Sequence, residues 1–263
     1  MYRFLLSPRW IGLGLLMTLA AATMVGLGLW QLSRYHFRSD INARIDAAGQ
    51  HAPLPLGDVL AAPGDGRVGA APAAENTWRV VTVTGRYDQR HEILARIRTL
   101  HNTVGFEVIT PLVLADGTAV LVDRGWIPAA AGDATTAPIV PAAPPGEITV
   151  VGRVHAPESR ATAPEPFDGR LAVRRVAPEQ LASSIPYPLY GAYLTLERQS
   201  PPADPAFETI PPDHENSAMN AGYVIQWWAF ALLTLGGLGY LIYREAHPVS
   251  TQDRRDDDVV SSG

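Results

Sequence analysis

The sequence predicts a membrane α+β protein in which two transmembrane helices flank one β-rich extracytoplasmic domain. Two long stretches, one near each end of the chain, are apolar and contain no charged residue. Between them, short segments alternate apolar and polar residues with the two-residue period of half-buried strands. These observations divide the 263 residues into a cytoplasmic N-terminus at 1–10, a first transmembrane helix at 11–30, the extracytoplasmic domain at 31–222, a second transmembrane helix at 223–243 and a disordered cytoplasmic tail at 244–263.

The first apolar stretch, Ile11 to Leu29, is long enough to cross about 30 Å of hydrocarbon as a helix. Trp10 and Trp30 bracket it, as interfacial aromatic anchors do. A cleaved signal peptide is the alternative, because Leu19 to Ala22 resembles a cleavage site. The transmembrane interpretation is favoured, since the apolar run exceeds the usual length of about 7–15 residues and continues beyond that site.

The second apolar stretch, Tyr223 to Tyr243, places both chain ends on one side of the membrane. Arginines before the first helix and after the second favour cytoplasmic termini, and a long loop is translocated largely regardless of its own charge. Gln226 lies about one helical turn inside this stretch. An amide at that depth either faces a protein or cofactor partner or lies at the interface beside Trp227, and both interpretations stay open.

The central region predicts mainly strands. Val81 and Val83 alternate with threonines, Asp116-Gly117 marks a hairpin turn, and Pro178 to Leu181 form the first turn of a short helix. The segments 81–87 and 148–154 resemble each other, which indicates either an internal duplication or two strands that each end at a glycine bulge. The expected strands are 78–87, 93–97, 106–114, 119–123, 147–154, 171–176 and 190–197.

The composition argues against several functions. The chain contains no cysteine, so it has no disulfide or thiolate metal site. Its net charge of −5 gives no electrostatic reason to bind nucleic acid. The histidines lack the spacing of a helical zinc site, and no nucleophile elbow or phosphate-binding glycine loop is present. The sequence therefore predicts a protein that is not an enzyme and holds no metal.

Three segments in order carry a resemblance to a known family. They are 28–34 (GLWQLSR), which ends the first predicted helix, 123–128 (DRGWIP), which closes a predicted strand, and 223–228 (YVIQWW), which opens the second helix. Together they resemble the Surfeit locus protein 1 (Shy1-like) family, over essentially Trp10 to Tyr243. The resemblance implies a bacterial plasma-membrane factor that assembles or stabilises aa3-type haem-copper cytochrome c oxidase, acting around haem a insertion into subunit I.

The implied partners are the oxidase subunits, subunit I foremost, and the lipid bilayer, with a respiratory supercomplex as a further candidate. Two alternatives stay open. In the first, the protein is an accessory subunit that is retained in the mature oxidase complex. In the second, it is a membrane-anchored extracytoplasmic ligand-binding domain unrelated to respiration.

The resemblance also supplies candidate site residues. Gly125 is expected to permit a backbone bend or close approach, and Trp126 to favour core packing over ligand contact. The family often carries a histidine, a candidate axial haem ligand, three residues before Tyr223. That position is Asn220, a poor iron ligand, which weakens the case for haem a as a cofactor. The candidates for partner or haem contact are Trp30, Gln31, Arg34, Arg124, Gly125, Trp126, Asn220, Tyr223, Gln226 and Trp227.

Overall fold

The computed structural model describes residues 3–130, 135–212 and 214–247. The chain divides into two compact units, a helical unit formed by residues 1–42 and 214–263 and a β unit formed by residues 43–213. Each unit is described by itself. Of the predicted disordered tail at 244–263, residues 248–263 lie outside the described residues, and α4 includes its first residues up to Ala246.

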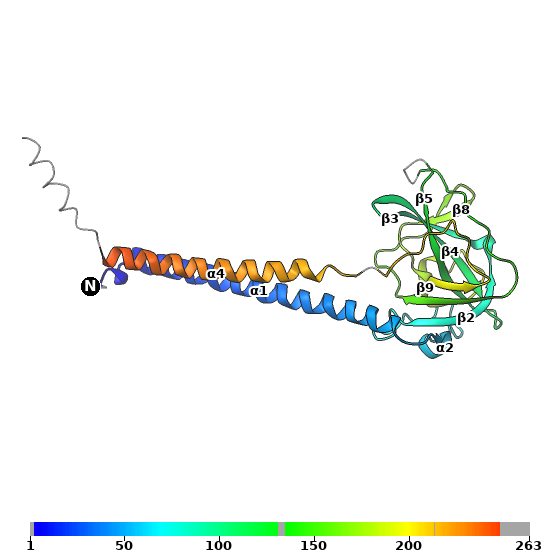
Figure 1. Cartoon of the computed structure of the whole chain (residues 1–263), viewed down its shortest axis with the longest axis horizontal. Coiled ribbons are helices and arrows are strands. Elements are labelled where there is room, and N and C mark those ends of the chain that lie inside the picture. Colours follow the sequence, from blue (N-terminus) through cyan, green and yellow to red (C-terminus); the bar gives the residue numbers. More distant parts are fainter. Residues whose placement is uncertain (1–2, 131–134, 213, 248–263) are drawn as a thin grey trace, which may run out of the picture. The chain divides into compact units, whose positions relative to one another are not determined.

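The helical unit contains α4 (Ser217–Ala246), a short 3-10 turn, η1 (Arg3–Leu6), and α1 (Pro8–Gly49) up to residue 42, whereas the last residues of α1 belong to the β unit (Figure 1). Both long helices are apolar enough and long enough to cross a membrane. The chain between the two helices forms a sheet, and helices and sheet together confirm the predicted membrane α+β class.

The expected helix ends were wrong, because α1 does not end near Arg34 and α4 does not open at Tyr223. Residues 31–49 contain no proline, and glycine occurs only at the last helical position, so nothing in this segment stops a helix before Gly49. α4 begins earlier because Asn216 caps it, its side-chain oxygen accepting a hydrogen bond from the Met219 backbone N–H at 3.2 Å. Both helices therefore continue beyond their apolar segments.

The β unit is built on a nine-stranded sheet with the order β1-β2-β6-β9-β5-β4-β3-β8-β7 (Figure 1). Three short helical turns accompany it: α2 (Leu56–Val59), η2 (Gln89–His91) and α3 (Pro178–Leu181). The strands are β1 (Leu54–Pro55), β2 (Val80–Tyr87), β3 (Ile93–Leu100), β4 (Thr103–Val113), β5 (Ala119–Pro128), β6 (Ile148–His155), β7 (Glu165–Phe167), β8 (Arg170–Val173) and β9 (Leu189–Ser200).

An additional pairing of β2 with β4 closes five of the strands into a ring, β2-β6-β9-β5-β4. The closing pairs are Arg86 with Val113 and Tyr87 with Leu112. Alternate side chains point into the ring and form its apolar core, and the opposite faces of β3, β4, β5 and β9 carry a second core covered by α3. The ring core includes Val81, Val83, Leu112, Val120, Val122, Ile148, Val150, Val154, Ala192 and Leu194.

Local geometry explains the similarity between segments 81–87 and 148–154. Gly85 lies where β2 leaves β6 and meets β4, and a Cβ there would be 2.5 Å from the Val113 carbonyl oxygen. Gly152 lies at a register shift between β6 and β9, where a Cβ would be 3.0 Å from the Thr195 oxygen. Each glycine permits a close backbone approach, which favours the glycine-bulge interpretation over a duplication.

Two predicted local features are confirmed. The β4–β5 hairpin turns at Gly117, whose φ is 81°, and Asp116 accepts a hydrogen bond from the Thr118 N–H at 2.9 Å. Pro178 occupies an N-terminal position of α3. The shortest strands, β1 and β7, were not predicted, because two or three residues carry no readable alternation.

Candidate functional site: a polar pocket on the outer face of the ring

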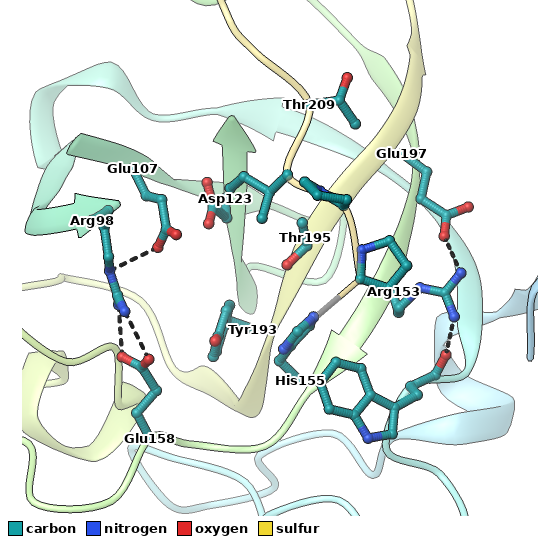
Figure 2. A pocket seen from close by; sticks show the side chains of 14 residues that line it. Arg98, Glu107, Asp123, Arg153, His155, Glu158, Tyr193, Thr195, Glu197 and Thr209 are labelled. Carbon is teal, nitrogen blue, oxygen red and sulfur yellow. Dashed lines mark hydrogen bonds and ion pairs between the residues drawn. The ribbon is translucent and has the colours of Figure 1, made fainter. Parts of the chain in front are cut away.

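A pocket of about 420 Å³ lies on the outer face of the ring (Figure 2). Strand alternation places its polar side chains there: Val122 points into the ring core, so Asp123 points outward. Asp123 pairs with Thr195 of β9, which in turn pairs with Arg153 of β6. The sheet register therefore aligns polar residues of three neighbouring strands, and the segment 209–212, which precedes α4 in the chain, lines the same pocket.

One side of the pocket is organised by Arg98. Its Nη1 and Nη2 contact the two carboxylate oxygens of Glu158 at 2.9 and 2.7 Å, and its Nε lies 2.9 Å from Glu107 Oε2. Burial alone would raise the pKa of Glu158, but the hydrogen bonds and charge of Arg98, together with the Val176 N–H, outweigh it, and the pKa is lowered. Arg98 and Glu158 therefore form a charged, two-pronged ion pair at neutral pH.

Asp123 and Glu107 form a carboxyl pair beside Arg98. Asp123 is 2% exposed and its Oδ1 accepts a hydrogen bond from the Gly125 N–H at 3.1 Å. Burial, together with the neighbouring charge of Glu107, raises the pKa of Asp123 well above its ordinary value. Burial also raises the pKa of Glu107, against the effect of Arg98. The two carboxyl groups are neighbours in a buried site, so the pair holds a proton up to a higher pH than an exposed carboxyl group would.

A strained bulge in β3 aims Arg98 at this carboxyl pair. The register between β3 and β4 shifts between Arg96 and Arg98, and the extra residue, Ile97, has a φ of 60°. A positive φ is unfavourable for a β-branched residue. Without the bulge, Arg98 would share the face of Arg96; with it, Arg98 faces Glu107.

The opposite side of the pocket is formed by Arg153 and three rings. Arg153 donates to Glu197 Oε1 at 2.7 Å and to the carbonyl oxygens of Ile45 and Trp78, each at 3.2 Å. The His155 ring stacks on Tyr193 at 5.0 Å and meets the Trp78 ring edge-on at 4.5 Å. Burial lowers the pKa of His155 to about 4, so its imidazole is neutral at physiological pH.

The predicted residues Arg124, Gly125 and Trp126 are not among the residues that line this pocket, but they position one of its walls. A Cβ at Gly125, whose φ is 135°, would lie 3.0 Å from the Glu208 carbonyl oxygen, so this glycine does allow a close backbone approach. The Trp126 N–H donates to the Glu208 carbonyl and the Glu208 N–H to the Trp126 carbonyl, both at 2.9 Å. Segment 123–128 thereby holds the chain just before 209–212 against β5.

Arg124 and Trp126 are both buried. Arg124, 4% exposed, donates to Glu92 Oε2 at 3.1 Å, and its guanidinium lies 4.7 Å from the Phe207 ring centroid. Trp126, 3% exposed, donates its indole N–H to the Arg98 carbonyl oxygen at 3.0 Å and lies over Gly105, where a Cβ would be 2.4 Å from the indole. Trp126 is therefore a core residue, and the sequence likewise favours core packing over ligand contact for it.

In the helical unit, three polar residues form a cluster that we call the polar clamp: Gln31, Arg38 and Asn220. The Asn220 Nδ2 donates to Gln31 Oε1 at 2.6 Å, and its Oδ1 accepts from Arg38 Nη1 at 3.1 Å. Nearby, Asn42 Nδ2 donates to the Glu215 carbonyl oxygen at 2.9 Å. The structure thus brings two of the predicted site residues, Gln31 and Asn220, together.

The other predicted residues of the helices lie at the surface of the helical unit. Trp30 is 58% exposed and Tyr223 42% exposed, and Arg34 and Gln226 are also exposed. Trp227 is half-buried and its ring meets Phe230 edge-on at 6.2 Å. Their side chains are available to lipid or to another membrane protein.

The sequence did not single out most pocket residues. Glu107 and Arg153 carried a readable signal, because each is a charged residue inside a predicted apolar strand. Arg98 was concealed by the bulge at Ile97, which the alternation does not reveal. His155 and Tyr193 meet only through the pairing of β6 with β9, which no local pattern indicates.

Comparisons with known proteins connect this architecture to one family. The model of the SURF1 family matches residues 18–232. Uncharacterised SURF1-like proteins of Mycobacterium bovis and Mycobacterium tuberculosis are each 31% identical over 245 residues, which is 92% of this chain and 86% of theirs. A SURF1-like protein of Dictyostelium discoideum is 30% identical over 101 residues, 38% of this chain and 37% of its own. The matched region contains the β unit and part of each apolar segment, so the chain belongs to the SURF1 family.

Proposed function

We propose that the protein is an assembly and stabilising factor for aa3-type haem-copper cytochrome c oxidase, acting around haem a insertion into subunit I. The observation that carries the proposal is the extent of the family match, residues 18–232, which covers the β unit as well as helical segments at both ends. SURF1 proteins are known generally as cytochrome oxidase assembly factors.

The exposed residues of the helices support a role that depends on contacts with another membrane protein. Trp30 and Tyr223 are large aromatic side chains exposed on the helical unit, and Gln226 is an exposed amide within an apolar helix. A polar side chain at membrane depth is stabilised when a protein partner satisfies it. These residues are the proposed contact points with the oxidase, subunit I foremost, within the bilayer.

Asn220 does not fit axial ligation of haem iron. A carboxamide is a poor iron ligand, and both polar atoms of Asn220 are occupied by Gln31 and Arg38. The proposed role therefore operates through protein contacts, and no step of it passes through iron bound at this position.

The proposed location is a bacterial plasma membrane, with both termini cytoplasmic and the β-rich domain extracytoplasmic. Arg3 and Arg9 before the first apolar stretch and Arg244 after the second support this orientation.

The proposal is tested in a strain that lacks this gene. We expect the a-type haem band in the reduced-minus-oxidised spectrum of its membranes to collapse and to return when the gene is restored. An unchanged band, with normal oxidase activity, would contradict the assembly role and favour a domain unrelated to respiration. Purification of the tagged protein then separates two modes of action: stoichiometric recovery with mature, active oxidase indicates an accessory subunit, and recovery with incomplete oxidase indicates a transient factor.

A further inference from the structure

The outer-face pocket contains more carboxyl groups than guanidinium groups. Glu107, Asp123, Glu158 and Glu197 line it, against Arg98 and Arg153. Four carboxyl groups face two guanidinium groups and a neutral His155, so even with one proton shared by Glu107 and Asp123 the lining keeps one negative charge in excess. Since this excess lies in a buried, low-dielectric environment, it attracts a cation more strongly than a surface carboxylate would.

Both arginines are already paired with carboxylates of the protein, which disfavours an anionic ligand. Arg98 is bound by Glu158 through two hydrogen bonds and lies against Glu107. Arg153 is bound by Glu197 and by two backbone carbonyls. A carboxylate or phosphate would have to break one of these pairs, and breaking a buried ion pair is strongly unfavourable.

The rest of the wall is aromatic and apolar. Trp78, His155 and Tyr193 lie together on one side, and Ile210, Pro211 and Pro212 complete the lining. Figure 2 shows His155 and Tyr193 across the pocket from Glu107 and Asp123. Aromatic faces attract organic cations, and an apolar wall accommodates a short hydrocarbon stem.

From this lining we propose that the pocket binds an organic cation, an alkylammonium or guanidinium group on a short apolar stem, with the charged group at Asp123 and Glu107 and the stem against Trp78 and Tyr193. The cation takes the place of the proton that the carboxyl pair shares. The binding site is independent of the role in oxidase assembly, so either proposal can fail alone.

Proton displacement gives the site a pH signature. The groups that face the carboxyl pair are Arg98 from β3, Glu158 from the segment after β6, and Tyr193 from β9. Because the pKa values of the pair are raised in the free site, cation binding releases a proton wherever the pair still holds one, and the affinity then rises with pH by up to about tenfold per pH unit. A purely apolar pocket would show no such dependence.

The experiment uses the full-length protein in detergent micelles and isothermal titration with agmatine, which carries an ammonium and a guanidinium group, as the cationic probe, and with n-butanol as an uncharged molecule with the same four-carbon stem. We expect saturable binding of agmatine, release of about one proton when two buffers of different ionisation enthalpy are compared, and weaker binding at lower pH. N-acetylarginine amide forms a second arm. Tighter binding of agmatine indicates a free amine as the natural ligand, and tighter binding of the arginine amide indicates a side chain of a polypeptide.

Variants locate the binding. Asp123→Asn and Glu107→Gln are each expected to weaken agmatine binding by at least about tenfold, and Asp116→Asn, in the exposed β4–β5 turn, leaves it unchanged. If either pocket variant fails to fold, the proton release of the unmodified protein still decides. Absence of saturable binding, equal binding of n-butanol, binding without proton release, or equal weakening by Asp116→Asn would each overturn the proposal.

Discussion

The guanidinium of Arg124 lies inside the β unit and is held from several sides. It pairs with Glu92, which also receives Arg170 at 3.3 Å, and it lies over the ring of Phe207. The segment that resembles the family therefore places a charge where it stabilises the fold, although an arginine beside a glycine and a tryptophan suggests a binding surface. Burial distinguishes the two roles, and burial cannot be read from three adjacent residues.

Replacing Arg124 by alanine is expected to lower the free energy of unfolding of the β unit by about 3 kcal/mol or more, because Glu92 is left buried without its main partner. The measurement is urea-induced unfolding of the purified full-length protein followed by near-ultraviolet circular dichroism. Arg86→Ala, which removes an exposed arginine from β2, serves as the control and is expected to change stability by less than about 0.5 kcal/mol. A loss that is equal in both variants would show that Arg124 is not specially stabilising.

His155 is expected to make the β unit less stable as the pH falls. Its pKa of about 4 in the folded protein is below the ordinary value of 6.5, so between these values the unfolded chain binds a proton that the folded chain excludes. The free energy of unfolding therefore falls from pH 6.5 towards pH 4, by at most about 3 kcal/mol for this one group.

His155→Phe keeps a ring between Tyr193 and Trp78 and removes the titrating group. We expect urea unfolding of this variant to show a shallower decline across the same pH range than that of the unmodified protein. His101→Asn, which alters an exposed histidine, should keep the full decline. Asp123 and Glu107, whose pKa values are raised, act in the opposite direction but are present in all three proteins, so they cancel in the comparison.

At the scale of elements, the two long helices were predictable and their ends were not. Apolar length specifies a membrane-spanning segment, but it does not indicate where the helix itself stops, because polar residues with good helix propensity continue it. The polar clamp lies in this continuation. The sequence shows only that Asn220 is a poor iron ligand. Its contacts with Gln31 and Arg38 depend on the register between the two helices, which the sequence does not give.

Gly28 gives a direct test of how α1 and α4 pack in the helical unit. A Cβ at this position would lie against the Trp228 indole, so Gly28→Leu is expected to separate the helices locally. Cysteines at Met24 and Thr234, whose side chains lie 3.7 Å apart, report the packing through a short bis-maleimide cross-linker. Gly28→Leu should lower the cross-linking yield severalfold, and Trp228→Ala in the same chain should restore it.

Gly26 is the matched control for that experiment. A Cβ there meets no atom within 4 Å, so Gly26→Leu adds the same bulk to the same helix without touching α4. Equal yields from Gly28→Leu and Gly26→Leu would show that the tryptophan does not pack into the glycine notch.

At the scale of the whole molecule, the proposed orientation predicts which residues can be labelled from outside the cell. Because the chain contains no cysteine, a single introduced cysteine reports one site. In spheroplasts treated with an impermeant maleimide, Asp116→Cys should react at once, and Ser7→Cys only after the membrane is permeabilised. The reverse pattern would mean that the domain faces the cytoplasm.

The class of the molecule and most of its strands could be predicted from local patterns, whereas their arrangement could not. Alternation marks a strand but does not name its neighbours, and the parallel pairing of β5 with β9 joins residues far apart in the sequence. The same limit applies to the pocket. Asp123 belongs to segment 123–128, which the sequence singles out. Arg153 and His155 lie near it only because β9 is placed between β5 and β6.

The position of β9 has a consequence for biosynthesis. This strand is the last of the nine to leave the ribosome, yet it lies in the middle of the ring, between β5 and β6. Until it arrives, β5 and β6 have no strand between them, so the ring stays open on that side and both cores lack the side chains of β9. In the proposed orientation, the domain completes its fold only after Ser200 has crossed the membrane, when synthesis of α4, beginning at Ser217, is almost due. Folding of the domain and insertion of the second apolar helix are then nearly simultaneous events.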